Sequence, residues 1–426
     1  MKNLRSFFFK HPFLVLVLFI GPFSNTPLLS VNILGLPGMK VFNLLSLALM
    51  LSWILKGGRI IHLRGTIETK AMLFLFAIVF LYSIEFFRSL SNYDLIDSRY
   101  LGRFPDSPLG FFFSYWVKNV LYIIPFVYIL QHIHEKIEAN VLLMFLMASY
   151  LCFDSVSMYA GYGVATSGLD REALLLSFMG TLGMHYNNAS TLIMIGIPIA
   201  MGIVYQFGIK YSGVLLFMFI SLFLAGSRGA MVGAIAGCIV VFLMGNKMSK
   251  KLFFLILIIF PMVLFSDSLG QFLTGGVSDG SADEMSSGRM SSMWVPIMNE
   301  LFGDAYKLFF GLGLLGIIQT DAYVFDPFFF QAVHAHNAYI NLLLNAGLVA
   351  FIPFLVVVFI FIKRSLRQGQ AIAEPAYYGL IGSVVAYLAA SFFGRHFLLD
   401  FDNMLLFPII ALIVVYIRLE KLRDKE

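Results

Sequence analysis

Long apolar stretches alternate with short polar ones along the 426 residues of the chain. A helix needs about 20 apolar residues to cross a bilayer, and stretches of about that length recur throughout the sequence. We therefore predict an all-α polytopic membrane protein that forms a single integral membrane domain over 1–426. We expect about 12 transmembrane helices, with approximate cores at 12–31, 39–55, 71–87, 111–130, 141–158, 190–207, 212–226, 229–245, 252–266, 337–362, 376–394 and 401–418.

Three polar segments are longer than a simple turn: 88–110, roughly 159–189 and 267–336. The last, between the ninth and tenth spans, is too long to be structureless in a compact protein, so we expect it to contain short helices. One is predicted at 290–302, where apolar side chains recur at helical spacing: Met290, Met293, Trp294, Ile297, Met298 and Leu301. Ser286 or Ser287 would cap its start, and Pro296 would kink or break it. Its apolar face would lie toward lipid at the outer membrane surface.

The composition agrees with a membrane protein and the charges orient it. Hydrophobic residues make up 59% of the chain and charged residues only 12%, with a mean hydropathy of +0.86. With the N-terminus in the cytoplasm, 19 of the 29 Lys and Arg fall in cytoplasmic segments, whereas 17 of the 24 Asp and Glu fall outside. The positive-inside rule then places both termini in the cytoplasm. The net charge of +5 is scattered over these segments, which argues against a nucleic-acid surface.

The N-terminus and the cysteines add little chemistry. Lys2, Arg5 and Lys10 precede an apolar run as in a signal peptide, but no small-residue cleavage site follows. We interpret this segment as an uncleaved first helix. Cys152 and Cys238 both lie in apolar stretches, so the sequence predicts neither a disulfide framework nor a thiolate metal site.

Two histidines, His334 and His336, stand at the polar boundary of the apolar run that continues to 362. Ionisable groups at such a boundary are costly and usually functional. An imidazole titrates near neutral pH, so His336, or else His334, is a candidate general base. The alternative is that they are polar boundary residues that cap the following helix. A His-X-His segment can also bind a metal, but the sequence offers no convergent third or fourth ligand, so no metal is predicted.

Two arginines, Arg228 and Arg289, are candidates for binding an anion. Small residues flank Arg228 between two consecutive spans, so a ligand could approach the backbone closely. Arg289 opens the predicted helix at 290–302. A guanidinium group can pair with two phosphate oxygens at once. The alternatives are a snorkelling arginine at 228 and a surface arginine beside Asp283 and Glu284 at 289.

Weaker candidates lie in the other polar segments on the same side of the membrane. Such side chains are more often solvated loop charges than ligands. They are Asp170, Arg171, Glu172, His185, Asn187, Asn188, Arg395, His396, Asp400 and Asp402.

The order of these motifs resembles the O-antigen ligase and polysaccharide polymerase superfamily of bacterial membrane glycosyltransferases. The resemblance covers about 190–365 in detail. It rests on Ser227-Arg228-Gly229-Ala230, Ser287-Gly288-Arg289, Gly311-Leu312-Gly313, His334-Ala335-His336-Asn337-Ala338-Tyr339 and Gly347. It implies a GT-C-like helical fold, a glycan donor on a polyprenyl pyrophosphate such as undecaprenyl pyrophosphate, and no metal or other cofactor. In this resemblance Arg228 and Arg289 hold the pyrophosphate, His336 matches the essential histidine, and His334 is its neighbour.

The sequence thus predicts a metal-independent, inverting glycosyltransferase of the bacterial inner membrane, with its site on the extracytoplasmic face. It would be an O-antigen or exopolysaccharide polymerase, slightly favoured here, or an O-antigen ligase. The expected partners are the lipid-linked donor, a glycan or lipid A-core acceptor, the lipid bilayer and a chain-length regulator. The alternative from another class is a polytopic transporter or a lipid-linked glycan flippase, which the absence of an internal repeat disfavours.

Overall fold

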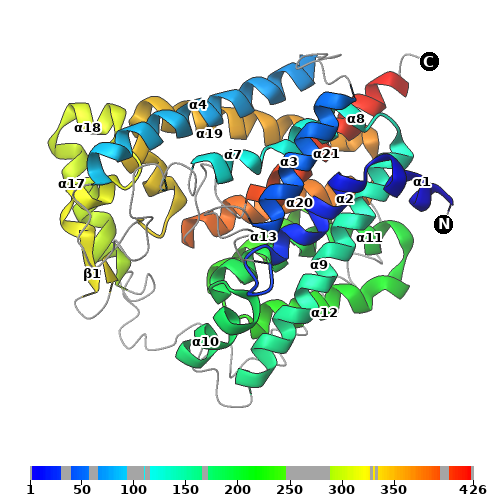
Figure 1. The fold of residues 1–426 in the computed structure, drawn as a ribbon, viewed down its shortest axis with the longest axis horizontal. Helices are drawn as coiled ribbons and strands as arrows, with labels where there is room; N and C mark the ends of the chain where they lie inside the picture. The colour runs from blue at the N-terminus through cyan, green and yellow to red at the C-terminus, as the bar shows by residue number, and fades with distance from the viewer. Residues whose placement is uncertain are drawn as a thin grey trace.

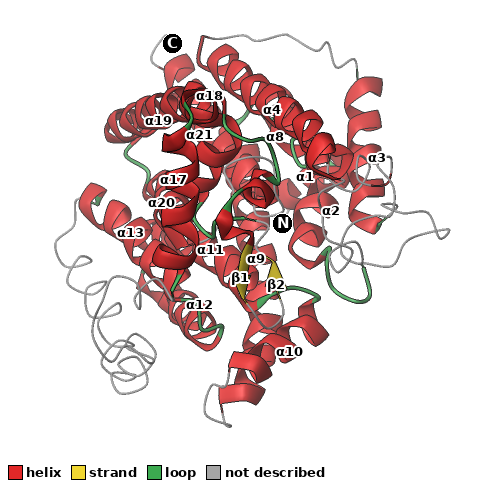
Figure 2. Cartoon of the chain, turned by 90° about the vertical axis from the view of Figure 1, so that its left-hand side faces the viewer, coloured by secondary structure: helices red, strands yellow, loops and turns green. Residues whose placement is uncertain are grey.

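The computed structural model describes residues 2–29, 40–56, 66–93, 110, 116–165, 171–245, 288–326, 330–331, 334–393 and 403–423. This part of the chain is mostly helical (Figure 1). Its strands are β1 (Val324–Asp326) and β2 (Phe330–Gln331), an antiparallel pair in the longest polar segment. Figure 2 shows the pair among helices. This pair covers only five residues, so the described part of the chain agrees with the predicted all-α class.

The helices of the first half are α1 (Lys2–Lys10), α2 (Pro12–Ile20), α3 (Val41–Leu55), α4 (Thr66–Tyr93), α7 (Lys118–Leu121), α8 (Ile124–His132), α9 (Lys136–Ala165) and α10 (Arg171–Leu182). Those of the second half are α11 (Tyr186–Phe207), α12 (Ser212–Leu224), α13 (Arg228–Met244), α17 (Val295–Gly303), α18 (Ala305–Phe310), α19 (Ala338–Ile372), α20 (Pro375–Ala390) and α21 (Asn403–Arg423). A π-helical turn, Met290–Trp294, precedes α17, and a 3₁₀ turn, Ser391–Phe393, follows α20.

Five helices of the described part are long and apolar enough to cross a membrane: Thr69–Leu90, Lys136–Tyr162, Tyr186–Phe207, Ala338–Ile372 and Pro375–Phe393. Shorter apolar helices include α3, α12 and α13, each at a predicted span. The span predicted at 252–266 lies outside the described residues, so the count of about 12 stays a prediction. One helix, α10, lies in the polar segment 159–189, where we predicted none. Its buried Leu174 and Phe178 belong to an apolar run too short to register as a span.

Three helices, α11, α13 and α20, pack closely through small residues at the centre of the molecule. A Cβ added at Gly237 of α13 would lie 2.5 Å from the carbonyl oxygen of Gly382 in α20. A Cβ at Gly379 would lie 2.6 Å from the carbonyl oxygen of Pro198 in α11. Small residues allow helix backbones to approach in membranes, where burial of apolar surface supplies little drive. The start of α13, which carries Arg228, is therefore held on a tightly packed scaffold.

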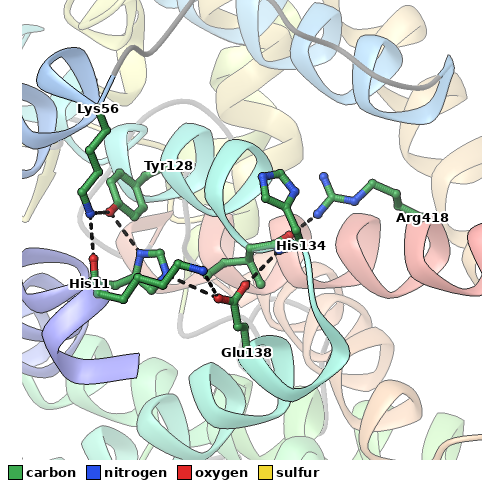
Figure 3. A network of polar contacts seen from close by, with 8 residues as sticks. His11, Lys56, Tyr128, His134, Glu138 and Arg418 are labelled. Carbon is green, nitrogen blue, oxygen red and sulfur yellow. Dashed lines mark hydrogen bonds and ion pairs between the residues drawn. The ribbon is translucent and has the colours of Figure 1, made fainter. Parts of the chain in front are cut away.

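Polar contacts join the connections at the end of the molecule where both termini lie (Figure 1, right). Lys10 forms an ion pair with Glu138, and Lys56 Nζ donates to the hydroxyl of Tyr128 at 3.1 Å (Figure 3). Arg418 donates to carbonyl oxygens at the end of α8. These residues come from segments that the charge pattern places together in the cytoplasm. Their meeting at one end of the molecule agrees with the prediction that these segments lie on the same side of the membrane. That this side is the cytoplasm stays a prediction.

His11 lies inside this network and is 2% exposed. Burial lowers its pKa to about 4, so the imidazole is neutral at pH 7. Its Nδ1 lies 3.1 Å from the Tyr128 hydroxyl, and its Nε2 lies 3.9 Å from Glu138 Oε1. Because a neutral ring supplies no charge, Lys10 rather than His11 balances the Glu138 carboxylate.

At the opposite end, α19 is broken at Gly347 and a loop fills the break. The backbone of Gly347 has φ 67° and ψ −173°, a region that essentially only glycine occupies. The amides of Leu312 and Gly313 donate to the carbonyl oxygens of Leu344 and Asn345 at 2.7 and 2.9 Å. The loop therefore satisfies backbone groups that the break would otherwise leave unpaired. The Gly311-Leu312-Gly313 motif and Gly347 therefore act together: one supplies the donors for the carbonyl oxygens that the other exposes.

Arg88, near the C-terminal end of α4, stabilises this junction. Its guanidinium donates to the carbonyl oxygens of Phe310 and Gly311, both at 2.6 Å, and lies 3.4 Å from Glu85 Oε1. Glu85 is 3% exposed, and its second carboxyl oxygen has no hydrogen-bond partner within the described residues. From the sequence Arg88 was expected in a polar loop. In the structure it belongs to α4, and its hydrogen bonds to Phe310 and Gly311 clamp this helix to the loop after α18.

We expect Arg88→Ala to destabilise the purified protein, because the carbonyl oxygens of Phe310 and Gly311 lose a charged donor. A hydrogen bond to a charged group contributes about 1.5–3 kcal/mol, and both of these are short. Arg88→Lys should give an intermediate loss, since it keeps the charge without the planar fork. Thermal unfolding in detergent measures both. An unchanged unfolding temperature in Arg88→Ala would contradict the clamp.

The helix predicted at 290–302 is present, but its surroundings differ from the prediction. Met293, Ile297 and Leu301 are fully buried, in a small core that includes Leu344 and Ile317. The apolar face therefore packs against the protein, and the prediction that it lies on lipid is wrong. Periodicity reveals that one face is apolar and not which surface covers it. The wide π-helical turn ends just before Pro296, which lacks the amide that a regular helix would use. The capping residues predicted at 286 and 287 lie outside the described residues.

Candidate functional site

The two histidines lie on a tight turn that leads into α19. Their ring centroids are 4.2 Å apart, with the planes inclined by 50°. Ala335 between them is fully buried, whereas both histidines are partly exposed. The two imidazoles thus lie side by side and accessible, with the alanine directed into the protein.

His336 adopts a left-handed backbone conformation, with φ 50°. Such a conformation costs a non-glycine residue about 1–3 kcal/mol and persists only where the surroundings impose it. The surroundings do so here through the peptide groups of Ala335. Its amide donates to Asn341 Oδ1 at 2.6 Å, and its carbonyl oxygen accepts from Trp294 Nε1 at 2.8 Å. Backbone strain of this kind concentrates at functional sites, which makes the turn a candidate site in its own right.

Arg289 is connected to this turn through Trp294. Arg289 immediately precedes the π-helical turn, and Trp294 is the last residue of it. The indole of Trp294 therefore ties the helix that Arg289 opens to the backbone between the histidines. Arg289 itself is partly buried and follows Gly288, whose φ of 73° starts the turn. π-Helical turns are rare and frequently occur at functional sites.

Arg228 is the first residue of α13 and is partly buried. The turn from α12 passes through Gly226, with φ 69°, and the cap residue Ser227. A helix N-terminus carries a partial positive charge, so a cation there is unfavourable on its own and an anion is stabilised. Backbone amides and a guanidinium at one helix start are suited to bind a phosphate.

Aromatic contacts link the start of α13 to the start of α19. A Cβ added at Gly229 would overlap Phe393, so the first turn of α13 lies directly on the 3₁₀ turn that ends α20. In that turn the ring of Phe392 lies 4.3 Å from the ring of Tyr339, whose hydroxyl donates to the carbonyl oxygen of Leu388 at 3.0 Å. Tyr339 is three residues from His336. The structure thus brings the elements that carry the two arginines and the two histidines to one end of the molecule.

Asparagines that the sequence analysis did not single out organise this region. Asn337, Asn341 and Asn345 recur every four residues at the start of α19, and all three are buried. Asn337 Oδ1 accepts from the amides of Tyr339 and Ile340 at 3.0 and 3.2 Å and so caps the helix. This polar stripe in an apolar run was a usable signal, because buried amides at helical spacing need defined partners.

We expect Asn337→Ala to destabilise the protein by about 1 kcal/mol, because the first turn of α19 loses its cap. Asn337→Asp should leave stability nearly unchanged, since aspartate caps helices equally well. Thermal unfolding of the two purified variants compares them directly. Equal losses in both would show that the cap is not what Asn337 contributes.

Of the weaker candidates, Arg171 and Glu172 begin α10, and His185, Asn187 and Asn188 lie at the start of α11. His185 is the cap of α11, and its Nδ1 accepts from the amide of Asn187 at 3.1 Å, which is the structural alternative for this residue. Asp170 and the candidates between 395 and 402 lie outside the described residues. Within the described part no group of three His, Cys, Asp or Glu could hold a metal. The metal-free mechanism stays a prediction.

The comparison with protein families agrees with the sequence motifs. Residues 213–355 match a family model described as O-Antigen ligase. The match spans α12, α13, the long polar segment and the first half of α19, and so includes Arg228, Arg289 and both histidines. It confirms the resemblance predicted from the motifs. No curated protein matches the chain.

Proposed function

We propose that the chain, whose residues 213–355 match a family model described as O-Antigen ligase, is a membrane glycosyltransferase that uses a lipid-linked glycan. The donor is a glycan on polyprenyl pyrophosphate, such as undecaprenyl pyrophosphate. The acceptor is a hydroxyl group of a second glycan or of a lipid A-core. The charge pattern puts both termini in the cytoplasm, and α17 lies at the other end of the molecule (Figure 1). Transfer therefore takes place on the extracytoplasmic side of the bacterial inner membrane.

In the proposed step the acceptor oxygen forms a bond to the anomeric carbon while the bond from that carbon to the pyrophosphate oxygen breaks. The acceptor proton passes to an imidazole nitrogen of His336, with His334 beside it as the second candidate base. The leaving group is polyprenyl pyrophosphate, which gains negative charge as the bond breaks. Arg228 and Arg289 stabilise that charge, and fixed donors of this kind contribute several kcal/mol in a poorly hydrated site. Direct displacement inverts the anomeric configuration.

One observation carries the proposal: the backbone of Ala335, between the two histidines, accepts from Trp294 at its carbonyl oxygen and donates from its amide to Asn341. A general base must be held in place to be effective. Trp294 also connects this turn to the helix that Arg289 opens. The position of Arg228 at the start of α13 supports the same reading, because a helix start favours an anion.

The test is transfer by the purified protein reconstituted in liposomes with a polyprenyl pyrophosphate-linked glycan. The expected result is a longer glycan, detected by mass spectrometry, together with released polyprenyl pyrophosphate. NMR of the new linkage should show the anomeric configuration inverted relative to the donor. Retention would rule out direct displacement.

The same assay, run with and without an added lipid A-core, distinguishes a polymerase from a ligase. If the donor alone suffices, one lipid-linked glycan serves as acceptor for another and the protein is a polymerase. If product forms only when a lipid A-core is added, the protein is a ligase. Movement of the donor across the bilayer with no new glycosidic bond would instead identify a flippase and overturn the proposal.

A further inference from the structure

An apolar groove lies between α4, α19, α20 and α21, away from the histidine turn. Its volume is about 510 Å³, within the range of roughly 300–1,000 Å³ found for ligand sites. The walls include Phe74, Phe354 and Phe407. α4 and α19 run side by side along one edge of the molecule (Figure 1), and the ring centroids of Phe74 and Phe354 lie 6.4 Å apart across them. The groove is therefore open along helices that face lipid.

One end of the groove carries polar groups. Lys70 and Arg364 line it, and within the described residues neither takes part in an ion pair. Ser365, next to Arg364 along α19, also belongs to the lining, but it is only 1% exposed, so its hydroxyl is not accessible to a ligand. Two cations at one end of an apolar groove suit a phosphate group.

The polar end lies opposite to the histidine turn. The histidine turn precedes Ala338, the first residue of α19, whereas Arg364 lies beyond the break at Gly347. The 17 positions from Gly347 to Arg364 alone correspond to about 26 Å of helix at 1.5 Å per residue. Along α19 the lining runs from Phe354 to Arg364, or about 15 Å, which is half of the roughly 30 Å hydrocarbon core. The groove therefore has the depth of one leaflet, the leaflet on the side of the chain termini.

We propose that this groove binds an anionic phospholipid of that leaflet, with its acyl chains along the apolar walls and its phosphate on Lys70 and Arg364. The depth fits a lipid of one leaflet better than a long polyprenyl chain, whose pyrophosphate would lie at the opposite membrane face. Acyl chains are as well solvated by other lipids as by apolar side chains, so chain contacts give little selectivity. The headgroup contacts therefore determine which lipid binds. This inference is independent of the proposed glycosyltransferase function.

The test is native mass spectrometry of the purified full-length protein titrated with phosphatidylglycerol or with phosphatidylcholine of identical acyl chains. We expect the first phosphatidylglycerol molecule to bind at least about tenfold more tightly than the first phosphatidylcholine. Phosphatidylglycerol carries a net negative charge, whereas the choline group of phosphatidylcholine balances its phosphate, and the groove offers two cations. The double variant Lys70→Gln/Arg364→Gln should lose this preference. The matched control is Lys363→Gln/Arg367→Gln, which removes two exposed charges from the same stretch of α19 outside the groove; it should keep the preference.

A second variant tests whether the lipid occupies the groove itself, because it leaves the charge of the groove unchanged. Ala77 is exposed and lines the groove, so Ala77→Trp fills the space without disturbing a packed core. It should abolish tight binding of the first phosphatidylglycerol while the unfolding temperature of lipid-free protein stays that of the wild type. Equal binding of the two phospholipids, an equal loss in the control variant, or displacement of the bound phosphatidylglycerol by undecaprenyl phosphate would each overturn the proposal. Because binding is measured directly, none of these outcomes depends on glycan transfer.

Discussion

Arg228→Ala, Arg289→Ala and His336→Ala are each expected to reduce glycan transfer by at least about 100-fold. Removing one preorganised charge-stabilising donor typically costs about 10²–10³-fold in turnover, and removing a general base costs about 10²–10⁴-fold. The measurement is initial transfer rate in liposomes with equal amounts of folded protein. Arg289→Lys should also be impaired, because lysine cannot pair with two phosphate oxygens in one plane.

The histidine requires a control for its backbone. The left-handed conformation of His336 means that alanine both removes the imidazole and keeps the strain. His336→Asn is the sharper variant, since asparagine adopts this conformation readily and cannot act as a base near neutral pH. Loss of transfer with an unchanged unfolding temperature would assign a chemical role. His134→Ala, which removes an exposed imidazole at the other end of the molecule, should transfer normally. Near-normal transfer by His336→Asn would leave His334 as the base or remove the assignment altogether.

The sequence predicted the elements of this site better than their arrangement. Apolar length predicted the long helices, because a helix satisfies its own backbone and needs only apolar side chains to enter lipid. The motifs predicted Arg228, Arg289 and the histidines as candidates. The turn at His336 was not predictable, because its conformation depends on Trp294 and Asn341, which lie elsewhere in the chain.

Arg88 shows the limit of local patterns most clearly. In the sequence it begins a polar segment with several charges, and nothing in that segment indicates that Arg88 binds backbone carbonyl oxygens. Its acceptors at Phe310 and Gly311 lie more than 200 positions later in the chain. Glu85, three residues before Arg88, was the available signal: a carboxylate inside a predicted span is expensive and implies a partner.

Gly347→Ala is expected to disrupt the junction between α19 and the preceding loop, with loss of folded protein from the membrane. The φ and ψ of Gly347 cost any other residue about 1–3 kcal/mol. In addition, a Cβ would overlap the carbonyl oxygen of Phe309, which is backbone and cannot turn aside. The loop that donates to Leu344 and Asn345 would then have to move.

The matched control is Gly303→Ala at the end of α17, where a Cβ has open space and the backbone needs no glycine. Fluorescence-detected size exclusion of both variants, followed by thermal unfolding of whatever is monodisperse, compares them at equal expression. Gly303→Ala should behave as the wild type. A Gly347→Ala protein as abundant and as stable as this control would mean that the break in α19 can close into a regular helix. In a continuous helix the carbonyl oxygens of Leu344 and Asn345 would accept from helix amides and no longer from the loop. The transfer rate of this variant would then show whether the break is needed for activity. The clamp at Arg88 holds this same break, so its loss should be the most damaging single change outside the proposed pyrophosphate and base residues.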